Sequence, residues 1–328
     1  MTRTTKIILT AALVFAGLST GTASADTGCA WTPGTLPLPA GSTTGYISGA
    51  ANGGWFVGSG STTDGVRWHG GTAEVLGQAF GHQTMLKDIN ASGVSVGTTI
   101  VDSFENGAVV HRNGRYEQLP LPQGYRAGRA KAINDAGDIV GMASRFADTF
   151  ELVLWPASAP GTALVINPDP AVYSYVSPVD IDEQGRILIR AEGQRRAYFV
   201  REAGGSLTEL SLKTDYVDAF RGGRISGEVY EDGKFVTVEW DTAGQLVRRL
   251  DVRARESVVD SGTLTSGTYR TADKQYAVGV WENGALTHTL LTDPDGAFGR
   301  PVVTDDGVIA VSYDYTGVIA TFTRRCSG

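Results

Sequence analysis

The sequence predicts an all-β fold, and three observations support this. A unit of about forty residues recurs along the chain, a period typical of solenoids and of ring-shaped repeat proteins. Each unit holds four short segments rich in β-forming residues, separated by turns that contain Gly, Asn or Asp. No segment shows a sustained helical period with capping residues. Four short strands in about forty residues are typical of one blade of a β-propeller, which is therefore the predicted architecture.

Seven units can be counted from a five-residue segment that usually begins with glycine and often ends with a second glycine. Its clearest copies are Gly93-Val94-Ser95-Val96-Gly97 and Gly137-Asp138-Ile139-Val140-Gly141. All copies together occupy residues 54–58, 93–97, 137–141, 185–189, 223–227, 263–267 and 307–311. The sequence therefore predicts a seven-bladed β-propeller.

The strands of a unit follow one another in a fixed order. A first strand leads into a polar turn, as in Ile89-Asn90-Ala91-Ser92-Gly93, where Asn and Gly suit a hairpin. After the second strand, the third ends in an aromatic residue or a substitute, and the fourth contains leucine or valine. The third-strand column consists of Trp68, His111, Trp155, Val200, Trp240 and Trp281. We interpret this column as packing between blades, so His111 is expected to be structural.

The last unit lacks its fourth strand, and the missing strand is found at the other end of the chain. Glu117–Gly124 closes a complete unit with Leu-Pro-Leu-Pro, and Gly34–Gly41 repeats those four residues near the start. We expect the region of residues 31–39 to pair beside the C-terminal strand. The last blade is then closed by the N- and C-terminal strands, which removes the open sheet edges that a ring does not tolerate.

Two cysteines, Cys29 and Cys326, lie at the ends of these two neighbouring strands. A secreted protein with two cysteines usually pairs them, so we predict a disulfide that clasps the ring. The loop-closure argument gives about 5–6 kcal/mol as an upper value for a loop of this length. Two free buried thiols are the alternative.

The first 25 residues predict a signal peptide. Arg3 and Lys6 precede an apolar run at residues 7–18 that is too short to span a bilayer, and Ala23-Ser24-Ala25 is a small-residue cleavage signal. Residues 26–328 are then a single propeller domain of a secreted, extracellular and monomeric protein. No other stretch is apolar and long enough to cross a membrane.

Charge limits the partners. The chain carries 28 basic and 35 acidic residues, a formal net charge of −7, and shows no basic cluster along the sequence. Such a chain is a poor binder of nucleic acid or of anionic membranes.

The segment Ala132–Gly141, followed by Leu154-Trp155, resembles the HAF-type repeats of bacterial extracellular proteins. The segment Asp88–Gly97 is similar. Units four to seven depart from the pattern, for example where Ile189 and Val311 replace the second glycine. The resemblance implies β-propeller-like repeats in an extracellular protein and brings no activity and no catalytic residues.

The sequence offers no recognisable catalytic or metal-binding constellation. None of the four histidines lies in a metal-ligand spacing, and no Gly-x-Ser-x-Gly motif occurs. We therefore assign no catalytic residue, no metal ligand and no cofactor. Asp293–Gly296 and Asp305–Gly307 are rich in aspartate and leave calcium open, although ordinary turn chemistry explains them. Ser61–Trp68 comes near a sialidase-like turn, with its Asp one position late.

Binding surfaces of propellers usually lie at one mouth of the channel, formed by the loops that lead into the first strands and join the second to the third. Here these loops are long and unlike one another, which suits a specific site. Aromatic rings with arginines suit a carbohydrate or a peptide. The candidate ligand-binding residues are Tyr125, Arg126, Tyr173, Tyr175, Tyr216, Arg253 and Arg300.

The sequence thus favours a secreted, non-catalytic binding or scaffolding module that recognises an extracellular glycan or protein at the propeller mouth. The alternative is a secreted glycoside hydrolase or lyase that uses carboxylates at the central channel. A purely structural role is the third possibility.

Overall fold

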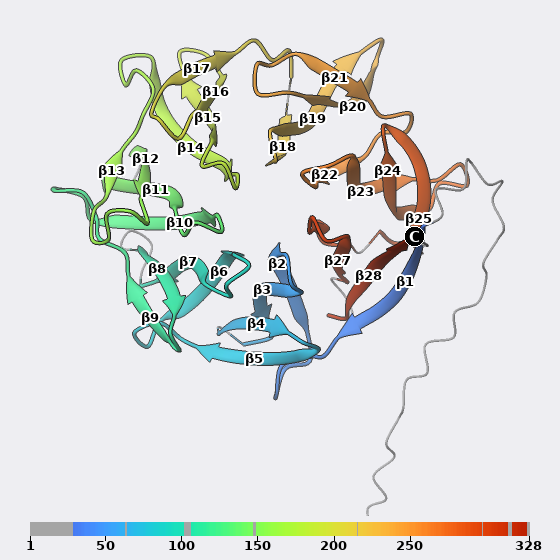
Figure 1. Cartoon of the computed structure of the whole chain (residues 1–328), viewed down its shortest axis with the longest axis horizontal. Coiled ribbons are helices and arrows are strands. Elements are labelled where there is room, and N and C mark those ends of the chain that lie inside the picture. Colours follow the sequence, from blue (N-terminus) through green and yellow to red (C-terminus); the bar gives the residue numbers. More distant parts are fainter. Residues whose placement is uncertain are drawn as a thin grey trace, which may run out of the picture.

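The computed structural model describes residues 29–62, 64–101, 106–146, 149–214, 216–296, 298–313 and 317–326. The predicted signal peptide at residues 1–25 lies outside these ranges. The described residues form seven four-stranded antiparallel sheets, arranged as the blades of a propeller around a central axis (Figure 1). We call the region along this axis, bordered by the innermost strands, the channel. The predicted seven-bladed β-propeller is therefore confirmed. No helix that could span a membrane occurs in this part of the chain.

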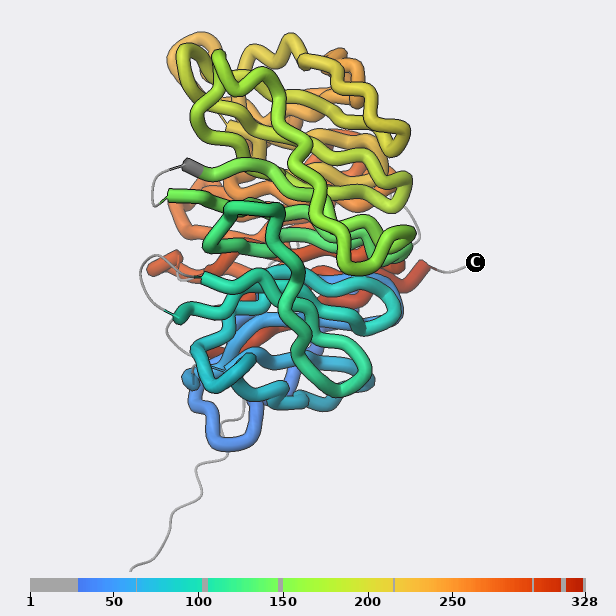
Figure 2. Tube along the Cα trace, turned by 90° about the vertical axis from the view of Figure 1, so that its left-hand side faces the viewer, coloured from blue at the N-terminus to red at the C-terminus, as the bar shows by residue number. Residues whose placement is uncertain are grey.

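Blades 1 to 6 each use four consecutive strands, which follow one another from the channel to the rim. Blades 1 to 3 are β2 (Gly45–Ala51), β3 (Trp55–Gly60), β4 (Gly65–His69), β5 (Thr72–Gly77); β6 (Gln83–Ile89), β7 (Ser95–Ile100), β8 (Asn106–Arg112), β9 (Arg115–Gln118); and β10 (Ala127–Ile133), β11 (Ile139–Phe146), β12 (Thr149–Trp155), β13 (Leu164–Val165). Blades 4 to 6 are β14 (Tyr173–Ile181), β15 (Ile187–Gly193), β16 (Ala197–Arg201), β17 (Leu207–Leu210); β18 (Tyr216–Arg221), β19 (Arg224–Glu231), β20 (Lys234–Trp240), β21 (Leu246–Arg249); and β22 (Arg255–Val259), β23 (Leu264–Arg270), β24 (Tyr276–Glu282), β25 (Ala285–Asp293). Seen edge-on, successive blades lie side by side around the ring (Figure 2).

Blade 7 joins the two ends of the described chain. Its strands from channel to rim are β26 (Val302–Val303), β27 (Val308–Ser312), β28 (Ile319–Cys326) and β1 (Cys29–Leu36). Strand β1 pairs antiparallel with β28 over its whole length, and the disulfide joins the paired residues Cys29 and Cys326. Both the split blade and the disulfide were predicted, and both are confirmed.

The tryptophan column packs between blades as expected. Trp68 and Trp155 are buried at the ends of β4 and β12. Trp68 donates from Nε1 to the carbonyl of Pro37 at 2.8 Å, and Trp155 donates to that of Pro120 at 2.6 Å. Each of these prolines is the first proline of a Leu-Pro-Leu-Pro segment. The unit divided between the two ends of the chain therefore makes the same contact as a complete unit. His111, also in the column, is buried.

One member of the column was assigned wrongly. In blade 4, Val200 pairs with Leu188, whereas Arg201 pairs with Ile187. By the register of the other blades, which pairs Ile139 with Trp155, the column position therefore belongs to Arg201. A strand repeats every two residues, so an alignment that slips by one residue selects the side chain on the opposite face.

The second glycine of the repeated segment has a steric cause. A Cβ atom on Gly97 would lie 2.2 Å from the carbonyl oxygen of Met85, and one on Gly141 would lie 2.0 Å from that of Arg129. Both oxygens belong to the innermost strand of the same blade. Only glycine allows the two backbones to approach so closely at these positions.

The hairpin turns between first and second strands form one face of the ring, which we call the turn face. On it, buried Asn90 accepts hydrogen bonds from Ser92 N and Val94 N, and its Nδ2 donates to the carbonyl of Asn134 in the next blade at 3.2 Å. Asn134 repeats the pattern, and its Nδ2 donates to the carbonyl of Asp182 at 3.2 Å. An aspartate has no amide donor, so the series stops at blade 4.

Candidate functional site

The opposite face, which we call the loop face, carries the loops that lead into the innermost strands and the loops that join second to third strands. Five aromatic side chains are exposed on it: Tyr46, Phe80, Phe146, Tyr216 and Tyr230. Phe146 exposes 73% of its surface and Tyr46, the least exposed, 37%. In the described part of the chain, no other Phe, Tyr or Trp is as exposed as these five. The loop face therefore concentrates the exposed aromatic rings of the described chain.

Phe80 is presented by a strained turn. Its φ is +56°, a left-handed conformation that disfavours bulky residues. The turn is closed by a hydrogen bond from His82 N to the Ala79 carbonyl at 3.0 Å, and Thr84 Oγ1 accepts from Ala79 N at 2.7 Å. These bonds hold the backbone while the Phe80 ring stays 58% exposed. Strained backbone is found preferentially at functional sites.

Two of the predicted binding tyrosines are buried inside their blades. The Tyr125 hydroxyl donates to the Glu151 carboxylate and accepts from Arg145 at 3.1 Å, while the Arg145 guanidinium lies 4.5 Å above the ring. Burial, together with Glu151, raises the pKa of Tyr125. Tyr173 is also buried and packs edge-on against Phe199 at 5.5 Å. The faces of both rings are occupied by the protein itself.

Two further candidates are engaged in other contacts. Tyr175 is half-buried and meets Phe150 edge-on at 6.2 Å. Arg253 forms two hydrogen bonds of 2.7 Å with the Glu228 carboxylate and lies 4.4 Å above Phe235. Arg253 therefore braces blade 5, because its charge is compensated and its flat face is covered.

The remaining candidates reach solvent. Tyr216 is 54% exposed at the start of β18. The side chains of Arg126 and Arg300 are exposed, and Arg300 donates to the backbone carbonyl of Asp218. These three residues lie on the loop face around the channel, although no contact joins them to one another.

The channel wall has a feature that the sequence reading missed. The innermost strands of blades 1 to 6 each carry a bulge at a corresponding place, located between the pairs Ile47/Gly49, Leu86/Asp88, Ala130/Ala132, Pro178/Asp180, Val217/Ala219 and Arg255/Val258. A bulge re-aims the extra side chain. In blades 2 and 3 this extra residue is Lys87 and Lys131, respectively.

Both faces of a blade are covered by neighbouring blades, so an exposed side chain of an innermost strand projects into the channel. Lys87 on β6 and Lys131 on β10 are exposed in this way, and Arg129 on β10 is exposed with its guanidinium turned towards the Phe150 ring of β12. Burial and the nearby Arg129 lower the pKa of Lys87. Burial lowers the pKa of Lys131 to about 8, and Arg300, Arg190 and Lys87 act in the same direction against Asp180. Lys87, Arg129 and Lys131 therefore form a cluster of cations on the wall of blades 2 and 3, whereas the corresponding bulge of blade 5 carries Asp218.

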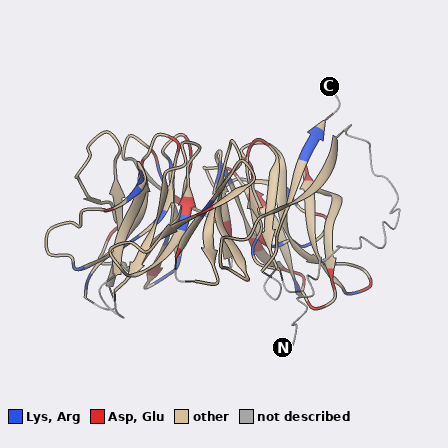
Figure 3. Ribbon diagram, turned by 90° about the horizontal axis from the view of Figure 1, so that it is seen from below, with Lys and Arg blue, Asp and Glu red and all other residues tan. Residues whose placement is uncertain are grey.

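The sequence contains no run of basic residues, as expected, but basic residues from different units lie close together in the fold. Lys87 and Lys131 are far apart in the chain, yet each precedes the first glycine of its repeated segment, Gly93 or Gly137, by the same number of residues. Superimposing the units would have brought the two lysines together. Elsewhere, acidic and basic residues are interspersed over the ring (Figure 3).

Towards the turn face the channel wall becomes acidic. Asp88 and Asp180 line a cavity of about 40 Å³ together with Ala50, Ala51, Ile89, Ile133, Ile181, Asp182, Glu183 and Arg221. Burial, reinforced by Asp180, raises the pKa of Asp88 to about 7. Burial raises that of Asp180 to about 6. The cavity has room for a few waters and not for a sugar ring.

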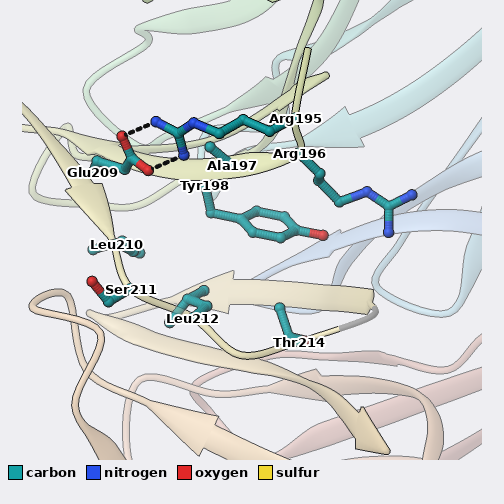
Figure 4. Close-up of a pocket in the computed structure, with 9 residues that line it drawn as sticks. All are labelled: Arg195, Arg196, Ala197, Tyr198, Glu209, Leu210, Ser211, Leu212 and Thr214. Carbon is teal, nitrogen blue, oxygen red and sulfur yellow. Dashed lines mark hydrogen bonds and ion pairs between the residues drawn. The ribbon is translucent and has the colours of Figure 1, made fainter. Parts of the chain in front are cut away.

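A second hollow, with a volume of about 200 Å³, is lined by blade 4 and by the segment that leads from it towards blade 5 (Figure 4). It is lined by Arg195, Arg196, Ala197, Tyr198, Glu209, Leu210, Ser211, Leu212 and Thr214. Arg195 and Glu209 form a double hydrogen-bonded ion pair across one wall. The hollow is smaller than typical ligand pockets of about 300–1,000 Å³. The described residues contain no group of three or more His, Cys, Asp or Glu that could hold a metal ion.

No family model and no curated protein matches this chain. Among solved structures, TolB from Acinetobacter baumannii is similar at 10% identity and a TM-score of 0.48, over 83% of this chain and 64% of TolB. A gluconolactonase from Xanthomonas campestris is similar at 14% identity and a TM-score of 0.44, over 87% and 88% of the two chains. A chain of the mitotic checkpoint complex reaches a TM-score of 0.53 at 10% identity, over 99% and 100%. At these identities the likeness concerns the propeller fold alone.

Proposed function

We propose that the protein is a secreted, non-catalytic binding module that recognises an extracellular glycan or protein on its loop face. The observation that carries this proposal is the collection of five exposed aromatic side chains around one mouth of the channel. Exposed rings gathered on one face favour a binding role, because stacking and burial of rings contribute strongly to recognition. A monomer is proposed as the binding unit.

Secretion is supported by two observations. The disulfide Cys29–Cys326 belongs to an oxidising compartment, since cytosolic thiols are kept reduced. The predicted signal peptide agrees with this location. Kinship with HAF-type repeat proteins is proposed on the same sequence grounds as before.

An enzyme is the second candidate, because Asp88 and Asp180 have the raised pKa values expected of acid catalysts. Their surroundings favour a structural role. The Asp88 carboxylate accepts from Ile133 N at 2.9 Å, and that of Asp180 accepts from Ile181 N at 2.8 Å. The cavity beside them is too small for a sugar ring. We therefore favour binding over hydrolysis.

The proposal can be tested by titrating residues 26–328 with extracellular polysaccharides and oligosaccharides in a thermal-shift assay. A ligand at 100 times its Kd should add about 2.7 kcal/mol of stability. Phe146→Ala and Tyr216→Ala should weaken binding at least tenfold. Val247→Ser on the outer strand β21, which removes an equally accessible apolar side chain, should leave it unchanged.

Equal affinity in all four proteins would contradict a site on the loop face. If the protein cleaved the ligand and the Asp88→Asn variant did not, the function would be hydrolysis and not binding alone.

A further inference from the structure

We propose that Lys87, Arg129 and Lys131 form an oxyanion-binding site in the channel, which takes the carboxylate or sulfate of an acidic saccharide. This inference rests on the proposed binding function and names the chemical class of its ligand. The aromatic rings of the loop face would contact the rest of the saccharide.

The three cations are held together by the fold. Lys87 and Lys131 occupy the same bulge position on the neighbouring strands β6 and β10. The hydrogen bond from Ile133 N to the Asp88 carboxylate, 2.9 Å long, ties these two strands together beside the bulges. Arg129 lies two residues before Lys131, on the side of the loop face. Because the strands fix their backbones, the side chains remain close without a partner to hold them.

Asp180 lies near Lys131, yet no described member of the cluster forms an ion pair, whereas most described arginines do. Arg67, Arg190 and Arg253, for example, each contact a carboxylate within 2.7 Å. Within the described residues, Lys87, Arg129 and Lys131 have no carboxylate oxygen within 4.0 Å. Like charges collected on one wall of the channel raise the positive potential there. A bound anion would relieve their mutual repulsion.

The free donors match an oxyanion. The Arg129 guanidinium lies 5.1 Å above the Phe150 ring, which orients it, and its N–H groups donate to no described residue. A planar guanidinium binds a carboxylate or sulfate through two parallel hydrogen bonds. Lys131 Nζ donates to the carbonyl of Pro178 at 2.5 Å and retains two further protons for a ligand. Lys87 retains three.

The remaining surface favours a short acidic saccharide over other anions. Long polyanions such as nucleic acids would meet a chain with a formal net charge of −7. The two hollows described above are small and polar, so they offer no apolar pockets for peptide side chains. Exposed rings on the loop face together with accessible cations on the inner strands suit a sugar that stacks on the rings and pairs its acidic group with the cations.

The experiment is isothermal titration of the mature protein with oligogalacturonate, with a heparin-derived sulfated oligosaccharide, and with fully methyl-esterified oligogalacturonate. We expect binding of at least one acidic oligosaccharide, which weakens as salt rises. Arg129→Gln and Lys87→Gln should each weaken it at least tenfold, and Arg129→Lys should restore part of it. Lys234→Gln, which removes an exposed cation from the loop face outside the channel, should change it by less than twofold.

Stability provides an independent readout. Because removing one member relieves repulsion, Lys87→Gln should unfold at the same temperature as the wild type or at a higher one. A loss of binding together with a loss of stability would indicate a merely structural role and would overturn the site. Binding of oligogalacturonate would identify the oxyanion as a carboxylate, and binding of the heparin-derived oligosaccharide would identify it as a sulfate. Either result supports the site.

The outcomes separate this site from the proposed function. Equal binding of the methyl-esterified oligomer, lost in Phe146→Ala and unchanged in Arg129→Gln, would retain the loop-face function and overturn the anion site. Binding of poly-glutamate in place of both acidic oligosaccharides would overturn the saccharide assignment. No binding of any of these anions would overturn the inference, while the wider saccharide screen still tests the proposed function.

Discussion

The two faces of the ring are built on different principles. On the turn face the same contact recurs between blades, with Asn90 and Asn134 each donating to the carbonyl at the corresponding position of the next blade. On the described loop face the contacts vary more from blade to blade: Tyr125 and Tyr173 are each buried beneath an arginine, whereas Phe80 is exposed on a strained turn. The comparison teaches that the repeat fixes the assembly of the ring on one side and leaves the other side free for individual contacts.

The largest effect is expected from removing the disulfide that closes the ring. Cys29→Ser should lower the free energy of unfolding by several kcal/mol, with about 5–6 kcal/mol as the upper limit for so long a loop. Urea denaturation of the variant, with and without reductant, measures the effect. Reductant should bring the wild type to the stability of the variant and leave the variant unchanged. Two free thiols in the secreted protein, found by mass spectrometry, would refute the clasp.

A turn-face residue tests whether the recurring contact stabilises the ring. Asn134→Ala removes a buried acceptor for Asp138 N and the donor to the Asp182 carbonyl. The loss should be about 2–3 kcal/mol, because buried backbone groups remain without partners. Chemical denaturation at pH 7 gives the value. Arg126→Ala on the loop face is the control and should change stability by less than about 0.5 kcal/mol.

The two buried aspartates at the turn-face end of the channel should make the stability of the protein depend on pH. Burial raises the pKa of Asp88 to about 7 and that of Asp180 to about 6, so the folded state holds these protons more tightly than the unfolded one. Stability should therefore fall as the pH rises from about 4 to about 7. Asp88→Asn should flatten this fall and raise stability at pH 8 by on the order of 2 kcal/mol.

Urea denaturation at pH 5 and pH 8 checks the sign of this effect. Asp232→Asn, at an exposed loop position, should leave the pH dependence as it is. If the stability of Asp88→Asn fell more steeply with rising pH than that of the wild type, the Asp88 carboxylate would stabilise the fold at high pH, contrary to the expectation.

The smallest expected effect lies at the strained turn of the loop face. Phe80→Gly should raise the free energy of unfolding by about 1 kcal/mol, since glycine adopts the left-handed conformation without strain. The same change should weaken ligand binding. Thermal denaturation and titration measure the two effects, and a lower stability would mean that the Phe80 ring supports the turn by packing.

The repeat made the architecture predictable. Leu36-Pro37 and Leu119-Pro120 lie where the equivalent strands β1 and β9 end, and the carbonyls of the two prolines accept hydrogen bonds from Trp68 and Trp155. The candidate site was less predictable, because the direction of a side chain depends on the strand register. The bulges at Lys87 and Lys131 turn these lysines into the channel, and no local pattern announces a bulge. Tyr173 reads as a loop residue in the sequence and is buried against Phe199 in the fold.

The disulfide has one more consequence, which concerns covalent connectivity. With Cys29 joined to Cys326, the described chain becomes a closed covalent circle of strands. A single cut by a protease in a loop between blades then leaves one connected molecule, whose new ends lie at the cut. The same cut after reduction leaves two separate fragments held only by non-covalent contacts. The oxidised protein therefore survives one cleavage as a single molecule and falls apart covalently only at the second.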